Sequence, residues 1–405
     1  MESALFAQRR GSLQEELSRR GIAAALLSDR VDRFYFSGTM QSSYLIIPAE
    51  KEAFLLTGRA GEGIAREVPG LKVYTFQNPA ELSACLAEAG LVGRLRLGIN
   101  PETMTAVEFG RWQRWLPAAV WEDIAPLLKR RRRIKDEVEL AALRKAGEAL
   151  RELPKWAAAA LKEGKTSELA LSVALESKLR LKGHGGFVRC GGILRESAIG
   201  VATAGASQSA GRFFAGVGTG GELDPVVSYG PGKHRIEPGD PVLLGYIMNY
   251  RGYHCKQTRM ISYGKNPPAA ARQVYDDLLE IVGLLEQELK PGAVAAELYA
   301  LVAKAMERKN RSESLPGLGG KKGKFFGHGI GLLLDEEPYL VPGAQEKLQA
   351  GMAIAVELAV MLRGIGVVGI GDTYLITKEG QERITPAQRE WRTVVTDPKT
   401  LKASG

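Results

Sequence analysis

The sequence is poor in cysteine, with Cys85, Cys190 and Cys255 as its three thiols among 405 residues. An odd, widely spaced set excludes a paired disulfide framework and a clustered cysteine zinc site. This usage is typical of a reducing compartment, so we expect a cytoplasmic location. Long apolar runs are also missing. Stretches such as AIAVELAVML are too short to cross a membrane and include Glu357, and the first residues show no signal-peptide pattern.

A strong charge of one sign is missing as well. Lys and Arg total 55 against 46 Asp and Glu, which gives a formal net charge of +9. Over this length the excess is mild, so composition gives no reason to expect a nucleic-acid or membrane partner. With 45% hydrophobic and 25% charged residues, the chain has the composition of a globular protein of about two to three domains.

Residues 1–128 are expected to form a small α/β domain, because helical and strand-like segments alternate at short spacing, beginning with SLQEELSRRG and IAAALLS. Residues 129–152 are interpreted as a basic linker and an opening helix. The run Arg130–Arg133 has two interpretations, a patch for phosphate or nucleic acid, and a solvated linker that pairs with acidic residues of a neighbouring domain. We favour the linker.

The remaining residues, 153–405, are expected to form a second, larger domain. A hairpin is predicted from PVLLGYIMNY and GYHCKQTRMISYG, with its turn at residues 249–252. Two long helices should follow. The tail then alternates glycine-rich turns with strands that contain GHGIG, GMAIAVEL and GIGDTYLIT.

Three stretches resemble the family of creatinase, aminopeptidase P, prolidase and methionine aminopeptidase. They are PGDPVLLGYIMNYRGYHCKQTRMISYGK, GHGIGLLLDEEP, and GMAIAVEL with GIGDTYLIT. The basic linker also resembles the helix that opens the catalytic domain of two-domain members. The resemblance covers about residues 20–385 and implies an α+β fold class, with a C-terminal pita-bread domain after a smaller creatinase-type α/β domain. It also implies a homodimer, since the first domain often serves dimerisation and substrate access.

The resemblance also implies which residues stand at a metal centre. Active metallopeptidases of the family hold two divalent metals, such as manganese, cobalt or zinc, with two Asp, one His and two Glu. Several carboxylates are needed to offset the charge of two cations that together activate a bridging water. Here His328 and Glu357 match two of the five positions, and Gly245, Lys256 and Gly371 stand at the other three. We therefore expect no metal cofactor, because Lys256 would repel an approaching cation.

The metal-free relative, creatinase, uses a histidine in the loop that precedes the first of these strands. The matching position here falls near Val227 or Ser228, and His234 lies too close to the strand. The creatinase pattern is therefore not reproduced either.

Other residues of these motifs are candidate ligand contacts. Asp335 and Glu336 stand where relatives carry a substrate-facing histidine and its acidic neighbour, and a solvated turn is the alternative. Cys255 is expected to be a buried, inert thiol, because strand alternation turns it away from Lys256. His254 shares the face of Lys256. The expected pocket around His328 and Glu357 therefore comprises Lys256, His254, Asp335, Glu336, Arg259, Gly245 and Gly371.

Lys256 and Glu357 are expected to form an ion pair, since the resemblance places both around one centre. An unpaired carboxylate in the apolar strand AIAVELAV would be costly. The alternatives are a Lys256 side chain that extends to solvent and a His328 that is only a packed remnant.

Three functions remain open. We favour a catalytically degenerate homologue of Xaa-Pro peptidases that binds a peptide or small ligand in the former active-site pocket. The second is a metal-independent hydrolase of a small C–N substrate, with His328 and Glu357 as acid and base. The third is an active Xaa-Pro metallopeptidase with unusual ligands.

Overall fold

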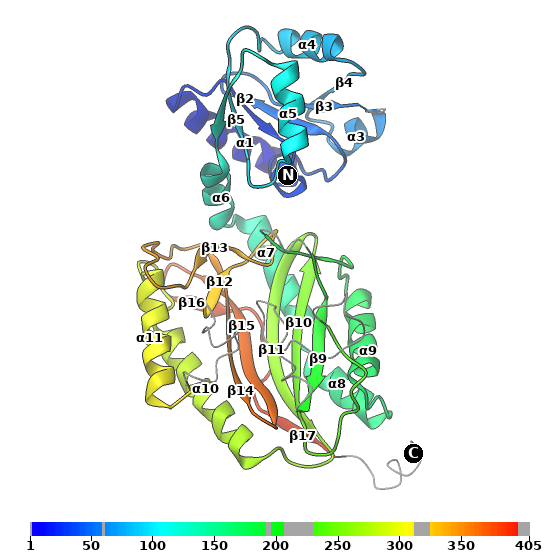
Figure 1. Ribbon diagram of the computed structural model, residues 1–405, viewed down its shortest axis with the longest axis vertical. Helices are drawn as coiled ribbons and strands as arrows, with labels where there is room; N and C mark the ends of the chain where they lie inside the picture. Colours follow the sequence, from blue (N-terminus) through cyan, green and yellow to red (C-terminus); the bar gives the residue numbers. More distant parts are fainter. Residues whose placement is uncertain (1, 59–60, 192–195, 206–229, 312–324, 396–405) are drawn as a thin grey trace. The chain divides into compact units, whose positions relative to one another are not determined.

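The computed structural model describes residues 2–58, 61–191, 196–205, 230–311 and 325–395. The chain divides into two compact units, Met1–Arg132 and Arg133–Gly405, and each is described by itself (Figure 1). The division falls inside the basic segment that was expected to link the domains. In the described part of the chain, no helix is both long enough and apolar enough to span a bilayer.

The first unit is a six-stranded mixed sheet with helices packed on it. Its elements are α1 (Glu2–Arg19), β1 (Ala24–Leu27), α2 (Arg30–Ser37), β2 (Tyr44–Pro48), β3 (Phe54–Thr57), α3 (Glu62–Glu67), β4 (Lys72–Thr75), α4 (Pro79–Glu88), β5 (Arg96–Ile99), α5 (Ala106–Trp115), β6 (Val120–Asp123) and α6 (Ala125–Arg133). The strand order is β4-β3-β2-β1-β5-β6. Trp112 is fully buried in its core, with its ring 4.9 Å from that of Tyr44.

The basic run lies in α6, and its side chains contact acidic groups. Arg132 forms a buried ion pair with Asp32, and the Lys129 ammonium lies 2.6 Å from the Glu102 carboxylate. These contacts agree with the interpretation as a paired segment. Asp32 and Glu102 belong to the domain of residues 1–128 that precedes the linker, and Arg133 of the same run lies 2.5 Å from the Glu337 carboxylate, so the linker pairs with acidic residues of neighbouring domains as expected.

The second unit is built on a nine-stranded sheet. Its elements are α7 (Glu137–Ala149), α8 (Leu153–Lys162), α9 (Glu168–Leu181), β7 (Val188–Arg189), β8 (Glu196–Ser197), β9 (Gly200–Ala204), β10 (Pro241–Tyr250), β11 (Tyr253–Tyr263), α10 (Ala269–Glu288), α11 (Ala295–Arg308), β12 (Gly327–Gly329), β13 (Glu336–Tyr339), β14 (Ala353–Leu362), β15 (Gly366–Ile376), β16 (Gln381–Arg383) and β17 (Arg392–Val394). The sheet runs β13-β12-β14-β15-β11-β10-β9, with β16 beside β15 and β17 beside β11, while β7 and β8 pair separately.

The predicted hairpin is confirmed as β10 and β11, which pair from Tyr250 and Tyr253 outward. The two turn residues, Arg251 and Gly252, both have positive φ, at 52° and 90°. That combination is typical of a two-residue turn whose twist matches the flanking strands. The turn therefore fixes which residues of β10 lie opposite which residues of β11.

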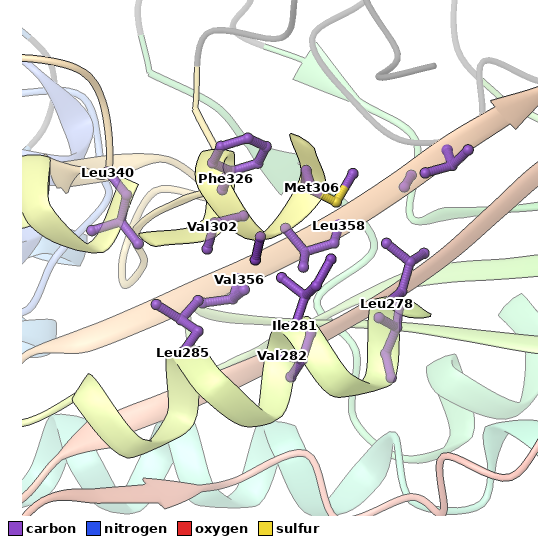
Figure 2. Packing of buried hydrophobic residues seen from close by; sticks show 14 of the residues in the cluster. Leu278, Ile281, Val282, Leu285, Val302, Met306, Phe326, Leu340, Val356 and Leu358 are labelled. Atoms are coloured by element: carbon purple, nitrogen blue, oxygen red, sulfur yellow. The ribbon is translucent and has the colours of Figure 1, made fainter. Parts of the chain in front are cut away.

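Helix α10 packs on one face of strand β14 in the large sheet. Leu278, Ile281 and Leu285 of α10 pack with Val356 and Leu358 of β14 in the main hydrophobic cluster (Figure 2). Successive side chains of a strand point to opposite faces. Glu357 lies between Val356 and Leu358 on β14. Its side chain therefore points away from α10.

Candidate functional site

A single row of paired residues crosses four strands of the large sheet. Gly245 of β10 pairs with Thr258 of β11, Thr258 pairs with Gly371 of β15, and Gly371 pairs with Glu357 of β14. Residues directly opposite one another on antiparallel strands point to the same face. The row therefore places three of the five positions implied by the resemblance side by side, away from the helices.

Glu357 is bound on both of its carboxylate oxygens. The Lys256 ammonium contacts Oε2, and the Thr258 hydroxyl donates a hydrogen bond to Oε1. The side chains of Lys256 and Glu357 are 11% and 14% exposed, so solvent reaches the pair only in part. The structure thus contains the predicted ion pair, and Lys256 does not extend to solvent.

His328 lies on the same face as this pair. It pairs with Ala355 of β14, two residues from Glu357, and is 7% exposed. Its Nδ1 lies 2.9 Å from the Gly329 carbonyl, which can only accept, so Nδ1 carries the proton and Nε2 carries the lone pair. Burial lowers the pKa of His328, and the positive charge of Lys256 lowers it further. The imidazole is therefore neutral at pH 7.

Gly371 and Gly245 differ in how much space surrounds them for a side chain. A Cβ atom at Gly371 would lie 3.1 Å from the Thr258 hydroxyl and 3.2 Å from the Val356 carbonyl oxygen, which is a tight approach. A Cβ atom at Gly245 would lie 3.4 Å from its nearest neighbour, a methyl carbon of Val201, which is an ordinary contact. A side chain is accommodated at position 245, whereas at position 371 it would have to displace its neighbours.

The side chains of the adjacent acidic residues Asp335 and Glu336 point in different directions. Asp335 is half-buried, and its Oδ1 accepts a 2.6 Å hydrogen bond from the Gly191 amide. Glu336 is buried and accepts hydrogen bonds from the Leu333 amide at 3.2 Å and the Lys135 ammonium at 3.4 Å. The expected pocket contact of Glu336 is therefore corrected, because strand alternation turns it toward Lys135.

Arg259 also leaves the expected pocket. It lies one residue beyond Thr258, so alternation along β11 points it to the opposite face. There its guanidinium is 2.6 Å from Asp372 and donates at 2.8 Å to the Gly371 carbonyl. Arg259 thus braces the backbone of the row from the helix-covered face and does not line the site.

His254 and Cys255 are both fully buried. The His254 Nε2 accepts from the Arg189 amide at 3.1 Å, and Nδ1 donates to the Gly331 carbonyl at 3.0 Å. Burial lowers the pKa of His254 to about 4, so the ring joins backbone segments as a neutral imidazole and is closed to a ligand. Burial raises the pKa of the Cys255 thiol to about 12, which confirms the expected inert thiol.

Sequence reasoning missed Thr258 and Cys190. The signal for Thr258 was present, because a residue two positions from Lys256 on a strand shares its face. Cys190 is half-buried, and burial raises the pKa of its thiol to about 12, with Asp335 raising and Lys256 lowering it. No pattern in the sequence connects it to residues so far along the chain.

Of the three residues near the position of the creatinase loop histidine, the structure describes one. Val227 and Ser228 lie outside the described residues. His234 is described, and its Nε2 lies 3.6 Å from the Asp240 carboxylate, in the turn before β10.

The donor set around Glu357 does not match what two divalent metals require. In the part of the chain that the structure describes, no three His, Cys, Asp or Glu side chains are grouped so that they could hold a metal ion. One imidazole and one carboxylate remain from the implied five ligands, and an ammonium and a hydroxyl already occupy that carboxylate. A divalent cation at this position would also meet the charge of Lys256.

The fold and these motif positions define a two-domain protein of the creatinase and prolidase type. Residues 141–378 match the model of Metallopeptidase family M24, and residues 9–134 match the Creatinase/Prolidase N-terminal domain. The first match spans more than half of the sequence, so the chain belongs to metallopeptidase family M24.

Individual relatives agree with this assignment. An uncharacterized peptidase, YqhT of Bacillus subtilis, is 24% identical over 380 residues, which are 93% of this chain and 98% of that protein. A Xaa-Pro dipeptidase of Pyrococcus horikoshii is 32% identical over 156 residues, 38% of this chain and 42% of that protein.

Solved structures share the fold at low identity. The prolidase from Pyrococcus horikoshii has a TM-score of 0.77 at 22% identity, over 95% of this chain and 99% of its own. A histidine-to-alanine variant of Escherichia coli aminopeptidase P has a TM-score of 0.74 at 18% identity, over 100% and 98%. The expected fold class, a creatinase-type domain followed by a pita-bread domain, is confirmed.

Proposed function

We propose that this chain is a non-metallo homologue of the Xaa-Pro peptidases, which binds a peptide or small ligand where its relatives hold their metals. The contact between the Lys256 ammonium and Glu357 carries the proposal. An ammonium held at a carboxylate supplies the positive charge that a metal would otherwise supply, and it competes with a metal for the same oxygens.

The glycine at position 371 supports the same conclusion. A carboxylate ligand there would need a side chain whose Cβ atom would lie only 3.1 Å from the Thr258 hydroxyl and 3.2 Å from the Val356 carbonyl oxygen. The Thr258 hydroxyl is itself held by its hydrogen bond to Glu357. Position 371 is thus packed for glycine in the present state of the site.

A metal-independent hydrolase is the alternative. The Nε2 lone pair of His328 has the character of a general base, since Nδ1 is held by a carbonyl. Glu357 is less suited to that role, because Lys256 and Thr258 engage both of its oxygens. We therefore place binding ahead of hydrolysis.

The test combines elemental analysis with turnover. Purified protein, exposed to manganese, cobalt or zinc and then desalted, should retain no stoichiometric metal and should not hydrolyse a Xaa-Pro dipeptide. About two equivalents of metal together with hydrolysis would overturn the proposal in favour of an active metallopeptidase. Hydrolysis that persists in a chelator and disappears in His328→Ala would favour the metal-independent hydrolase.

We also propose that the protein is a homodimer to which residues 1–128 contribute contacts, and that it is cytoplasmic. The dimer rests on similarity to two-domain relatives, and the location on the sparse cysteines. Light scattering at micromolar concentration tests the first proposal, and a monomer would contradict it. Fractionation of cells that contain the tagged protein tests the second.

A further inference from the structure

Two hydrogen-bond acceptors beside the Lys256–Glu357 pair have no partner among the described residues. One is the Nε2 atom of His328, a residue that is 7% exposed and whose ring is hydrogen-bonded through Nδ1. The other is the Oδ2 atom of Asp335, whose Oδ1 is held by the Gly191 amide. Neither atom is fully enclosed by protein, so a ligand that reaches the site can donate a hydrogen bond to each of them.

These two acceptors belong to neighbouring strands. His328 lies in β12, and Gly329 beside it pairs with Glu336 of β13, the residue that follows Asp335. Glu336 points to Lys135 on the other side, so alternation gives Asp335 the same side as His328. The charges of Asp335, Lys256 and Glu357 all act on the His328 imidazole, as expected if the ring lies among them.

The charge of this group is unbalanced by one unit. Lys256 and Glu357 neutralise each other, and His328 offers a lone pair at Nε2 because Nδ1 donates to the Gly329 carbonyl. Asp335 adds one negative charge, and no Lys or Arg of the described residues forms an ion pair with it. A ligand that carries a single positive charge would therefore leave the group neutral.

We propose that these residues bind a protonated amine, with its ammonium between Oδ2 of Asp335 and Nε2 of His328. The inference rests on the proposed function and names the class of ligand. An ammonium carries one charge and three donors, which suits one carboxylate oxygen and one imidazole lone pair. The like charge of Lys256 does not prevent binding, because Glu357 already compensates it.

Calorimetric titration at pH 7 with matched pairs of small molecules tests the inference. The first pair is n-butylamine and N-butylacetamide, and the second is L-alanyl-L-alanine and its N-acetyl derivative. Each free amine should bind at least about tenfold more tightly than its acylated partner, because acylation removes the charge and two donors. Binding by both amines indicates a general amine site, and binding by the dipeptide alone indicates a peptide amino terminus.

Asp335→Asn provides the matching change in the protein. The asparagine carbonyl can still accept from the Gly191 amide, but it has lost the negative charge, so amine affinity should fall by about tenfold to a hundredfold. Glu346→Gln removes an exposed carboxylate elsewhere in the same unit and should leave affinity unchanged. If Asp335→Asn does not fold, the comparison of free with acylated molecules on the unmodified protein still tests the amine inference.

Equal binding of free and acylated molecules would overturn the amine inference and leave the proposed function intact. Absence of binding by both pairs up to about 10 mM would also overturn it. Failure of the proposed function would be distinguishable, since it would be seen as bound metal or as turnover in the separate assays.

Discussion

The ion pair between Lys256 and Glu357 predicts an unusual order of stabilities among three variants. Both side chains are more than four-fifths buried, and the carboxylate also holds the Thr258 hydroxyl. Removing one partner of a buried pair commonly costs about 3–5 kcal/mol by stranding the other charge. Because the pair is partly hydrated and Thr258 remains, we expect Lys256→Ala to lower the free energy of unfolding by about 2–4 kcal/mol.

The double variant Lys256→Ala with Glu357→Gln should be more stable than Lys256→Ala. The neutral amide no longer needs a counter-charge and can still accept from Thr258, so about half of the loss should be regained. Urea denaturation of the two variants, together with Glu357→Gln, completes a double-mutant cycle. In a thermal scan each kcal/mol corresponds to roughly 2–4 °C.

An exposed ion pair provides the control. Lys290 and Glu288 lie 3.0 Å apart with half-exposed side chains in the same unit, and Lys290→Ala should change stability by less than about 0.5 kcal/mol. The reasoning fails if Lys256→Ala is no more destabilising than Lys290→Ala. It also fails if Lys256→Ala and the double variant melt at the same temperature.

Three further predictions follow from the site and its surroundings. Gly371→Ala should destabilise by about 1–3 kcal/mol because of the contact with Thr258, whereas Gly245→Ala should be neutral or slightly stabilising, and equal urea midpoints would contradict this. Burial lowers the pKa of His254 to about 4, so its contribution of roughly 3 kcal/mol is complete above its ordinary pKa of 6.5 and is lost as pH falls toward 4. Denaturation at pH 7.5 and pH 5 should show about 2 kcal/mol of this loss, because pH 5 lies between the two pKa values, and His254→Gln should show a smaller loss. Replacing Gly245, Lys256 and Gly371 together by Asp, Asp and Glu should give a protein whose melting temperature rises with manganese, and an equal rise in the unmodified protein would refute the account of the site.

Much of the second unit was predictable from short motifs. The turn at Arg251 and Gly252 fixes the register of β10 on β11, and this register sets Gly245 opposite Thr258. Once the hairpin is known, strand alternation places Lys256 and Thr258 on one face. Predicting the contact between Lys256 and Glu357 then needed only the position of β14 in the sheet, and the order of the motifs implied that position.

Other features depend on pairings that no local pattern contains. Alternation alone would have turned Arg259 away from Lys256, but its partner Asp372 is identified only when β15 is placed. Lys135 and Glu336 meet across 201 positions of sequence. Helix α2 in the first unit was not anticipated. Its sequence RVDRFYFS holds three adjacent aromatic residues, which favour a strand, and the Asp29 cap stabilises the helix locally.

Under the proposed function, the residues at 245, 256 and 371 together prevent repulsion among carboxylates at a site that holds no metal. A site built for two cations holds several carboxylates that repel one another once the cations are absent, and such repulsion raises carboxylate pKa values and opposes folding. Two glycines remove charge without adding bulk, and Lys256 adds the one cation that Glu357 needs. A single substitution among the three would have left an uncompensated charge in a mostly buried position. Their joint effect is a neutral pair beside Asp335, and that remaining carboxylate is the feature from which a new ligand preference follows.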